Sequence, residues 1–406
     1  MNYNIHTLNN GIRLVHCSTE SPIAYCGLIV NTGSRDEKEH EHGLAHFLEH
    51  AIFKGTQKRR SYHILNRLES VGGDINAYTT KEETCIYTAF LTDQYERSIE
   101  LMSDMIFNSN FPVAEIEKEK DVIIDEINSY KDNPSELIFD EFEDLVFKNQ
   151  ALGRNILGDP EKIKSYSRDN LVSFKESNYP TNQFVLFSIG KIDFKKLTKL
   201  VVKYFGNCPE KLMPKRNIAS YVYLPFNKKE VKNTHQLHCI IGNVAYNYHD
   251  EKRTALSLFN NLLAGTSMNS RLSMALREKS GIAYDIESNY TGYSDNGIFS
   301  LYFGTEKDKF DKSIKLINKE FDDLKNNKLG VLQLQRAKQQ LIGQIAISAE
   351  NKENSALNLG KSLMLFDKID DLKEINNRIL AVTSSEIMEV ANEILDSKQL
   401  SMLVYE

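Results

Sequence analysis

The sequence lacks the features of a membrane protein and of a disulfide-stabilised protein. No apolar run approaches the roughly 20 residues that an α-helix needs to cross a bilayer. The five cysteines are isolated and form no C-x-x-C pair, which argues against a disulfide framework and against a cysteine-based metal site. The N-terminus shows neither the basic start nor the apolar stretch of a secretory signal peptide. We therefore expect a cytoplasmic protein with reduced thiols and no membrane partner.

Concentrated positive charge is also missing. The chain has 50 Lys and Arg residues against 56 Asp and Glu residues, a net charge of −6, and no long basic block. This balance gives no reason to expect a nucleic acid as partner. The 406 residues, 41% of them hydrophobic, provide for two or three domains with sizeable cores.

What is present is a compact set of metal-binding and acid–base groups, His46-Phe-Leu-Glu49-His50. Residues four apart on a helix lie on one face, so both imidazoles can bind a single metal ion. Glu49 then sits beside that ion, where a carboxylate can take a proton from water. The order H-x-x-E-H is typical of the inverzincin peptidases.

The flanking sequence predicts a helix from His42 to Lys54, before Gly55. Its apolar residues recur with helical spacing and predict a buried stripe of Leu44, Phe47, Leu48 and Ala51. The alternative interpretation is an ordinary amphipathic helix that carries two solvated histidines.

A catalytic zinc has three protein ligands and one open position, so a further donor must come from elsewhere in the chain. Residues 115–130 predict a second helix, with an apolar stripe of Ile116, Ile123, Ile127 and Tyr130. Glu119 and Glu126 lie two turns apart beside this stripe. One could bind the metal while the other supports a histidine, but their spacing does not choose between them. The alternative is a solvated Glu/Lys-rich face.

Three segments of the N-terminal region together resemble the signature of the M16 (pitrilysin/insulysin-type) zinc peptidases. They are Gly33-Ser-Arg-Asp-Glu37, Gly43 to His50, and Phe53-Lys-Gly-Thr56. The mitochondrial processing peptidase and short bacterial homologues belong to this family. In the family, the third zinc ligand is a glutamate in a later helix, with a second glutamate one heptad before it.

The resemblance therefore implies one Zn²⁺ per chain, bound by His46, His50 and Glu126. It implies that Glu119 supports this ligand set, and that Glu49 is the general base.

A second likeness concerns the binding of substrate. Residues 71–79 resemble the substrate-binding edge strand of the family. The residues themselves predict a turn at Gly72-Gly73 and a strand over 75–79, paired with a strand over 84–90. An unpaired edge can hold an extended peptide through its backbone, and the resemblance implies that role for Asn76, Ala77, Tyr78 and Thr79. The alternative is an ordinary hairpin with a protected edge.

The second half of the chain contains a block, Leu263 to Tyr284, that resembles the C-terminal block of the family. The resemblance implies that Arg277 and Tyr284 complete the active site. Both are hydrogen-bond donors, suited to the scissile carbonyl and its developing oxyanion. Without the family they would be interpreted as a surface and a core residue.

For the fold we predict an α+β protein with two homologous α/β-layered domains, as in the mitochondrial processing peptidase. We place an N-terminal zinc-binding domain at 1–210, a linker at 211–229, where prolines and basic residues gather, and a C-terminal domain at 230–406. The family also implies that two chains pair into a clamshell chamber.

The predicted function is that of a zinc-dependent endopeptidase for peptides and unfolded segments. Because this chain holds both the H-x-x-E-H motif and the Arg277/Tyr284 pair, we expect a homodimer with two sites, each completed by the pair of the other chain. Two alternatives stay open: a maturation protease dedicated to one precursor peptide, and a non-catalytic partner subunit.

Overall fold

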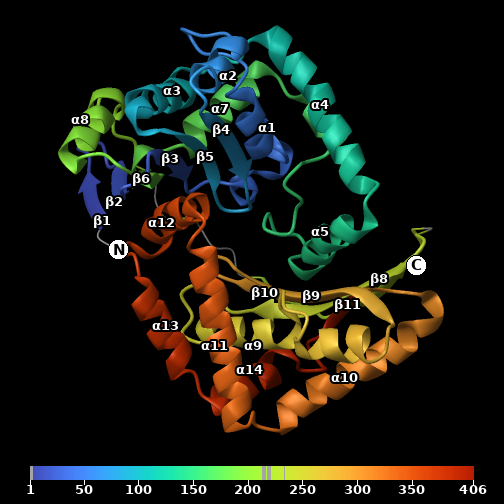
Figure 1. Cartoon of the computed structure of the whole chain (residues 1–406). Helices are drawn as coiled ribbons and strands as arrows, with labels where there is room; N and C mark the ends of the chain where they lie inside the picture. Colours follow the sequence, from blue (N-terminus) through green and yellow to red (C-terminus); the bar gives the residue numbers. More distant parts are fainter. Residues whose placement is uncertain (1–2, 213–215, 217–220, 233) are drawn as a thin grey trace. The chain divides into compact units, whose positions relative to one another are not determined.

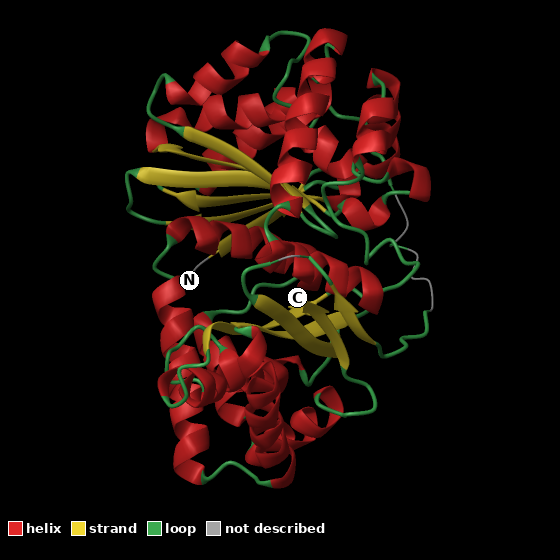
Figure 2. Cartoon of the chain, turned by 90° about the vertical axis from the view of Figure 1, so that its right-hand side faces the viewer, coloured by secondary structure: helices red, strands yellow, loops and turns green. Residues whose placement is uncertain are grey.

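The computed structural model describes residues 3–212, 216, 221–232 and 234–406, and the chain forms two compact units (Figure 1). The first unit comprises Met1–Ser129, Arg154–Asn217 and Ile347–Asp371, and the second comprises Tyr130–Gly153, Ile218–Ala346 and Leu372–Glu406. Each unit is built around one mainly antiparallel sheet with helices on both faces (Figure 2). Within the described residues, no helix is both long and apolar enough to span a membrane.

The sheet of the first unit has six strands in the order β1-β2-β6-β3-β5-β4. Neighbours pair antiparallel except β2 and β6, which are parallel. The strands are β1 (Tyr3–Thr7), β2 (Arg13–Ser18), β3 (Ile23–Val30), β4 (Asp74–Thr79), β5 (Thr84–Leu91) and β6 (Phe184–Gly190). Among the described strands, β4 pairs with β5 alone, so the predicted edge strand and its partner are confirmed.

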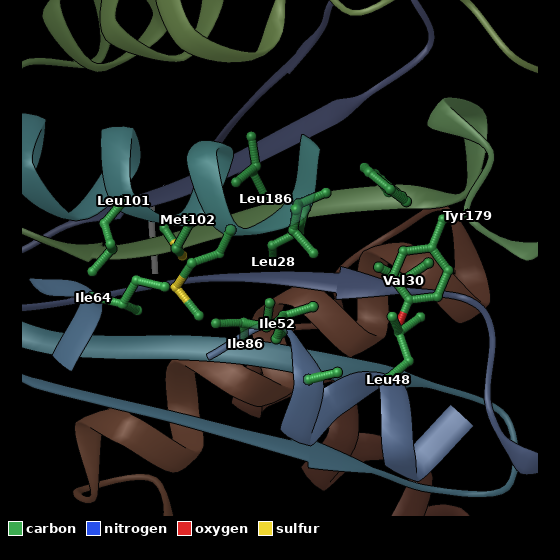
Figure 3. Packing of buried hydrophobic residues seen from close by; sticks show 14 of the residues in the cluster. Leu28, Val30, Leu48, Ile52, Ile64, Ile86, Leu101, Met102, Tyr179 and Leu186 are labelled. Carbon is green, nitrogen blue, oxygen red and sulfur yellow. The ribbon is translucent and has the colours of Figure 1, made fainter. Parts of the chain in front are cut away.

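Both faces of this sheet are buried, because successive side chains of a strand point to opposite faces. Leu28 and Ile86 face a large core, whereas their neighbours Ile29 and Cys85 face a second, smaller core. Figure 3 shows the larger core, in which Leu28 and Ile86 pack near Leu48 of a covering helix. Cys85 is a fully buried strand residue, so it packs as a small hydrophobe.

The larger core is covered by helices of the N-terminal half, and the smaller core by a single helix, α12. The helices of this unit are α1 (Leu44–Ala51), α2 (Ser61–Glu69), α3 (Tyr95–Asn108), α4 (Val113–Lys131), α6 (Pro160–Ser165), α7 (Arg168–Asn178), α8 (Phe194–Phe205) and α12 (Lys352–Phe366). The C-terminal end of α4 passes into the second unit.

The sheet of the second unit has five strands in the order β7-β11-β8-β10-β9. They are β7 (Asn227–Glu230), β8 (Leu237–Ala245), β9 (Ala283–Gly292), β10 (Gly297–Thr305) and β11 (Ser401–Tyr405). The helices are α5 (Pro134–Val146), α9 (Arg253–Ala264), α10 (Phe310–Asn326), α11 (Val331–Ser348), α13 (Leu372–Ala381) and α14 (Ser384–Ile394). α9 and α14 pack in one core, and α5 covers the opposite face of the sheet at β8 and β11.

The two sheets share one topology. The order β2-β6-β3-β5-β4 in the first corresponds to β7-β11-β8-β10-β9 in the second, and in each only the first pair is parallel. β1 is an additional strand of the first sheet. This correspondence confirms the predicted α+β fold with two similarly built halves.

Each unit also contains one helix that comes from the other half of the sequence. α12 packs on β3 and β6, and α5 packs on β8 and β11, so the two helices occupy equivalent faces. The contiguous ranges predicted from the sequence, 1–210 and 230–406, therefore differ from the compact units at residues 130–153 and 347–371. The difference has a physical cause: α5 and α12 bury their apolar faces on sheets that lie far from them in sequence. Residues 213–215 and 217–220 of the predicted linker lie outside the described residues.

Gly360 brings α12 into close contact with its sheet, and this contact can be tested. A Cβ atom at Gly360 would lie 2.5 Å from the buried ring of Phe187, whereas one at Gly343, inside α11, would meet nothing within 4 Å. We expect Gly360→Ala to lower the free energy of unfolding by about 1–3 kcal/mol, the usual cost of overpacking. Chemical denaturation measures this.

Gly343→Ala is the matched control. It introduces the same methyl group into a helix with free space, so it should raise stability by about 0.5–1 kcal/mol through helix propensity. If both substitutions stabilised the protein, the close packing of α12 on its sheet would be contradicted.

Candidate functional site

The H-x-x-E-H segment lies in α1, which begins at Leu44. The backbone just before the helix has an unusual conformation. Gly43, the residue before it, has φ 94°, a left-handed conformation that favours glycine. A Cβ atom there would also lie 2.8 Å from the Cα atom of Gly158. The predicted stripe is confirmed, since all four of its residues are buried: Leu44, Phe47, Leu48 and Ala51.

Because glycine has no side chain, the first N–H groups of α1 need a partner from elsewhere. Glu37 supplies it. Its Oε2 accepts a hydrogen bond from the N–H of Gly43 at 3.0 Å, and its Oε1 accepts one from the N–H of Ala45 at 2.7 Å. Arg154 donates a hydrogen bond to the backbone oxygen of Glu37. Burial raises the pKa of Glu37 to about 8, and the two N–H donors oppose this rise.

The two histidines of α1 converge on Glu126 of α4. The Nε2 atoms of His46 and His50 lie 3.8 and 3.6 Å from Oε2 of Glu126. In the described part of the chain, these three form the one group of His, Cys, Asp or Glu residues whose ligand atoms could share a metal ion, all within 4.8 Å of one another. The glutamate brought to the histidines is thus Glu126, which spacing alone had not distinguished from Glu119.

Glu119 instead contacts the far side of His50. Its Oε1 lies 2.8 Å from Nδ1 of His50, and its Oε2 lies 2.6 Å from Nζ of Lys54. When Nδ1 donates a proton to this bond, Nε2 is left with the lone pair that faces Glu126. Ile116, Ile123 and Ile127 are buried as predicted, whereas Tyr130 is half-buried and belongs to the second unit.

The surroundings act differently on the two imidazoles. Burial, with the nearby charge of His50, lowers the pKa of His46 to about 3, so its imidazole is neutral. Burial works against a charge on His50 too, but the Glu119 hydrogen bond and the Glu49 charge raise its pKa. Burial also disfavours the charge of Glu119, yet hydrogen bonds from His50 and Lys54 hold its pKa below the ordinary value.

Glu49 lies on the same helix between the two histidines. Burial raises its pKa, and a hydrogen bond from Thr79 opposes this rise. In that bond, Oγ1 of Thr79 donates to Oε2 of Glu49 at 2.8 Å. The general base predicted from the motif therefore stands next to the candidate metal ligands and in contact with β4.

β4 holds the four residues predicted to bind substrate. Asn76 and Ala77 pair with Tyr87 and Ile86 of β5, and the other side of the strand has no neighbouring strand in the sheet. Two of the side chains have partners within the unit: Oη of Tyr78 donates to Glu83 at 3.1 Å, and Thr79 donates to Glu49. β4 and α1 also pack against each other.

Arg277 and Tyr284 lie in the second unit, apart in sequence and unit from the histidine cluster. Arg277 is near the end of a π-helical turn, Ser273–Glu278, and its Nε lies 3.0 Å from Oε1 of Glu278. Tyr284 is the second residue of the strand β9 and is 77% exposed. Gly281, with φ 60°, donates its N–H to the Arg277 oxygen, which brings the turn and β9 together. Arg277 is half-buried and Tyr284 is exposed, so the expectation that Tyr284 without its family would be a core residue does not hold.

Two contacts of the site are not predicted by the sequence. Glu37 is predicted only as part of a motif, and Thr79 only as a substrate-binding residue. An available signal for Glu37 was a helix that begins at a glycine with no Ser, Thr, Asp or Asn cap, since some other acceptor must then serve its N–H groups. No signal in the sequence connects Thr79 with Glu49, because that contact joins an edge strand to a helix.

Two family models match the chain. Residues 14–160 match the model described as Insulinase (Peptidase family M16), and residues 165–341 match the model described as Peptidase M16 inactive domain. An uncharacterized zinc protease of Rickettsia felis is 31% identical over 99% of this chain and 97% of its own length. The uncharacterized zinc protease YmxG of Bacillus subtilis is 31% identical over 96% of this chain and 95% of its own length.

The mitochondrial-processing peptidase subunit beta of Saccharomyces cerevisiae is 29% identical over 94% of this chain and 86% of its own length. Among solved structures, a protease from Helicobacter pylori has a TM-score of 0.90, with 19% identity over 100% of this chain and 99% of that one. At that identity the structural match establishes a shared fold.

The Glu37 cap leads to a prediction about stability. A glutamine at this position offers one acceptor oxygen in place of two and turns an amide N–H₂ toward a backbone N–H. We expect Glu37→Gln to lower the free energy of unfolding by about 1–3 kcal/mol, the usual cost of leaving a buried donor without its acceptor. Denaturant unfolding, followed by circular dichroism, measures the loss.

Glu39→Gln makes the same chemical change at an exposed position nearby and should stay within about 0.5 kcal/mol of the parent protein. Equal stability of the two variants would show that Glu37 does not cap α1.

Proposed function

The chain belongs to peptidase family M16, and on that premise we propose that it is a zinc-dependent endopeptidase for peptides and unfolded segments. One observation carries this proposal: His46, His50 and Glu126 converge while Glu49 lies beside them on the same helix. Relatives of the same length, in Rickettsia felis and Bacillus subtilis, are named zinc proteases. Two neutral imidazoles and a carboxylate are the donor set of several catalytic zinc sites.

The geometry of the three donors fits such an ion. Zinc binds nitrogen and oxygen ligands at about 2.0–2.2 Å in a tetrahedron, which puts neighbouring ligand atoms about 3.4 Å apart. The distances from Glu126 Oε2 to the histidine Nε2 atoms are 3.8 and 3.6 Å, and all the ligand atoms lie within 4.8 Å of one another, so the three side chains would draw closer together around the ion. His46, His50 and Glu126 would hold the ion, and Glu119 would orient His50.

Bound zinc would supply a Lewis acid that lowers the pKa of water and polarises the scissile carbonyl. Glu49 takes the proton of the attacking water onto a carboxylate oxygen and later passes it to the leaving amine. The free edge of β4, Asn76 to Thr79, holds the substrate backbone by strand addition. Arg277 and Tyr284 donate hydrogen bonds to the developing oxyanion.

Substitution of the proposed general base, Glu49, tests the proposal. Glu49→Gln retains the shape of the side chain but cannot accept the proton, so the turnover number should fall by at least about 100-fold. The ligands are untouched, so metal analysis should still find about one zinc per chain. The assay is cleavage of a mixed library of unstructured peptides by the zinc-loaded protein, analysed by mass spectrometry.

Near-wild-type turnover by Glu49→Gln would show that Glu49 is not the base. The same library separates the broad endopeptidase from a second candidate, a maturation protease for one precursor. The likeness to the mitochondrial-processing peptidase subunit favours this candidate, and it predicts that almost all random peptides stay intact. A protein that binds zinc and cleaves no peptide at all would instead fit a non-catalytic partner subunit.

We propose further that the active form is a homodimer that encloses a chamber, with each zinc site completed by Arg277 and Tyr284 of the other chain. The support is that one chain carries both halves of the machinery, in two separate units. Symmetric pairing is the commonest way for such a chain to build two equal sites.

Mixed dimers test this sharing. Glu49→Gln and Arg277→Ala chains are each inactive alone, but a mixed dimer contains one site with both residues intact. After subunit exchange at a 1:1 ratio, about a quarter of the wild-type activity should return, because half of the dimers are mixed and one of their two sites works. If each site uses residues of one chain only, no activity returns although exchange is complete.

A further inference from the structure

The hydroxyl of Thr79 donates a hydrogen bond to the carboxylate that the proposed function uses as its base. We propose that Thr79 is a positioning residue, which fixes the rotation of the Glu49 carboxylate so that its second oxygen faces the attacking water. This inference rests on the proposed function and deepens it. It also revises the role expected from the sequence, in which Thr79 only binds substrate.

Glu49 needs such a partner because its carboxylate is otherwise free to rotate. The terminal torsion of a glutamate is broad and roughly two-fold, so helix geometry alone does not orient its oxygens. In the described part of the chain, Thr79 provides the one hydrogen bond found for the Glu49 side chain, and it engages Oε2 at 2.8 Å. Oε1 is thereby left as the oxygen that can accept a proton.

Thr79 can serve as an anchor because its own position is strongly constrained. It forms the last pair of the β4–β5 ladder, opposite Thr84. The turn that follows is closed by the N–H of Thr80, which donates to the oxygen of Glu83 at 2.8 Å. As a β-branched residue, Thr79 also has few rotamers, so its hydroxyl direction is well defined.

The loop that follows β3 also forms hydrogen bonds with this turn. The N–H groups of Ser34 and Arg35 donate to the oxygens of Thr80 and Lys81, at 3.1 and 2.8 Å. Gly33 permits this contact, since a Cβ atom there would lie 2.3 Å from the oxygen of Thr80. The loop continues to Glu37, which caps α1. The carboxylate of Glu49 and the hydroxyl that holds it therefore lie on two elements tied to one loop.

This arrangement connects substrate binding with the base. Thr79 ends the free edge of the sheet, so a peptide added along β4 would order the strand whose last side chain orients Glu49. A residue that only binds substrate should affect KM, whereas a residue that orients the base should affect kcat. This difference separates the two roles.

The experiment compares Thr79→Val, which replaces the hydroxyl by a methyl group of similar size, with Thr79→Ser, which retains the hydroxyl. For the zinc-loaded protein and one peptide cleaved by the wild type, we expect Thr79→Val to lower kcat about 10- to 100-fold with KM nearly unchanged. Thr79→Ser should recover kcat to within about three-fold of the wild type, because the donor is the same.

Three measurements exclude a merely structural effect. The zinc affinity, the thermal unfolding temperature of the metal-free protein and the affinity for a non-cleavable peptide should be alike in Thr79→Val and wild type. The matched control is Thr88→Val, which removes a buried hydroxyl of β5 that bonds to Cys26 and Ser98 and does not touch Glu49. It should leave kcat unchanged.

Four results would overturn the inference: full kcat in Thr79→Val, a rise in KM or in the peptide dissociation constant at unchanged kcat, no recovery in Thr79→Ser, or loss of zinc binding in Thr79→Val. Each leaves the proposed function standing, since the wild type is active in the same assay. If the wild type itself cleaves no peptide, the proposed function fails, and the role of Thr79 fails with it.

Discussion

The placement of one short helix is the constraint on which the site depends. α1 has eight residues, well below the length at which an isolated helix is stable in water. Its position must therefore come from its surroundings. Phe47 and Leu48 are fully buried in the larger core, and three carboxylates or hydroxyls hold its polar groups: Glu37 at the start, Thr79 at Glu49, and Glu119 at His50.

These contacts come from four parts of the first unit, namely the loop after β3, the edge strand β4, the helix α4 and the core beneath. The core fixes the position of the helix, the loop fixes its start, β4 fixes the rotation of the Glu49 carboxylate, and α4 fixes the tautomer and tilt of His50. Preorganisation of this kind matters for chemistry, because a catalytic group that is misplaced by about 1 Å can cost 100-fold in rate. The polar contacts of the site thus hold its side chains in defined orientations as well as stabilising the fold.

The repeated topology places the two predicted sets of site residues in equivalent connections. α1 lies between β3 and β4, and Arg277 lies between β8 and β9, where β3 corresponds to β8 and β4 to β9. The second connection has no H-x-x-E-H motif, and it carries instead an arginine followed by an exposed tyrosine. One sheet plan thus carries two different sets of side chains in equivalent connections, and α5 and α12 each cover the face of a sheet opposite its larger core. The placement of these two helices also explains why domain limits drawn as contiguous ranges miss the compact units.

The sequence by itself determined the local features. The spacing of His46, Glu49 and His50 and the periodic apolar residues predicted a helix with both imidazoles on one face. The Gly72-Gly73 turn and the strand-forming residues after it predicted the β4–β5 hairpin. The spacing of Glu119 and Glu126 did not show which of them meets the histidines; the family resemblance implied Glu126, and the tertiary structure brings Glu126 to them. Only the tertiary structure decided which carboxylate caps α1 and that Thr79 contacts Glu49. The reason is physical: periodicity reports which side of an element is buried, because burial follows the repeat of the backbone. The meeting of two side chains from distant elements depends on how those elements pack, and no local pattern records it.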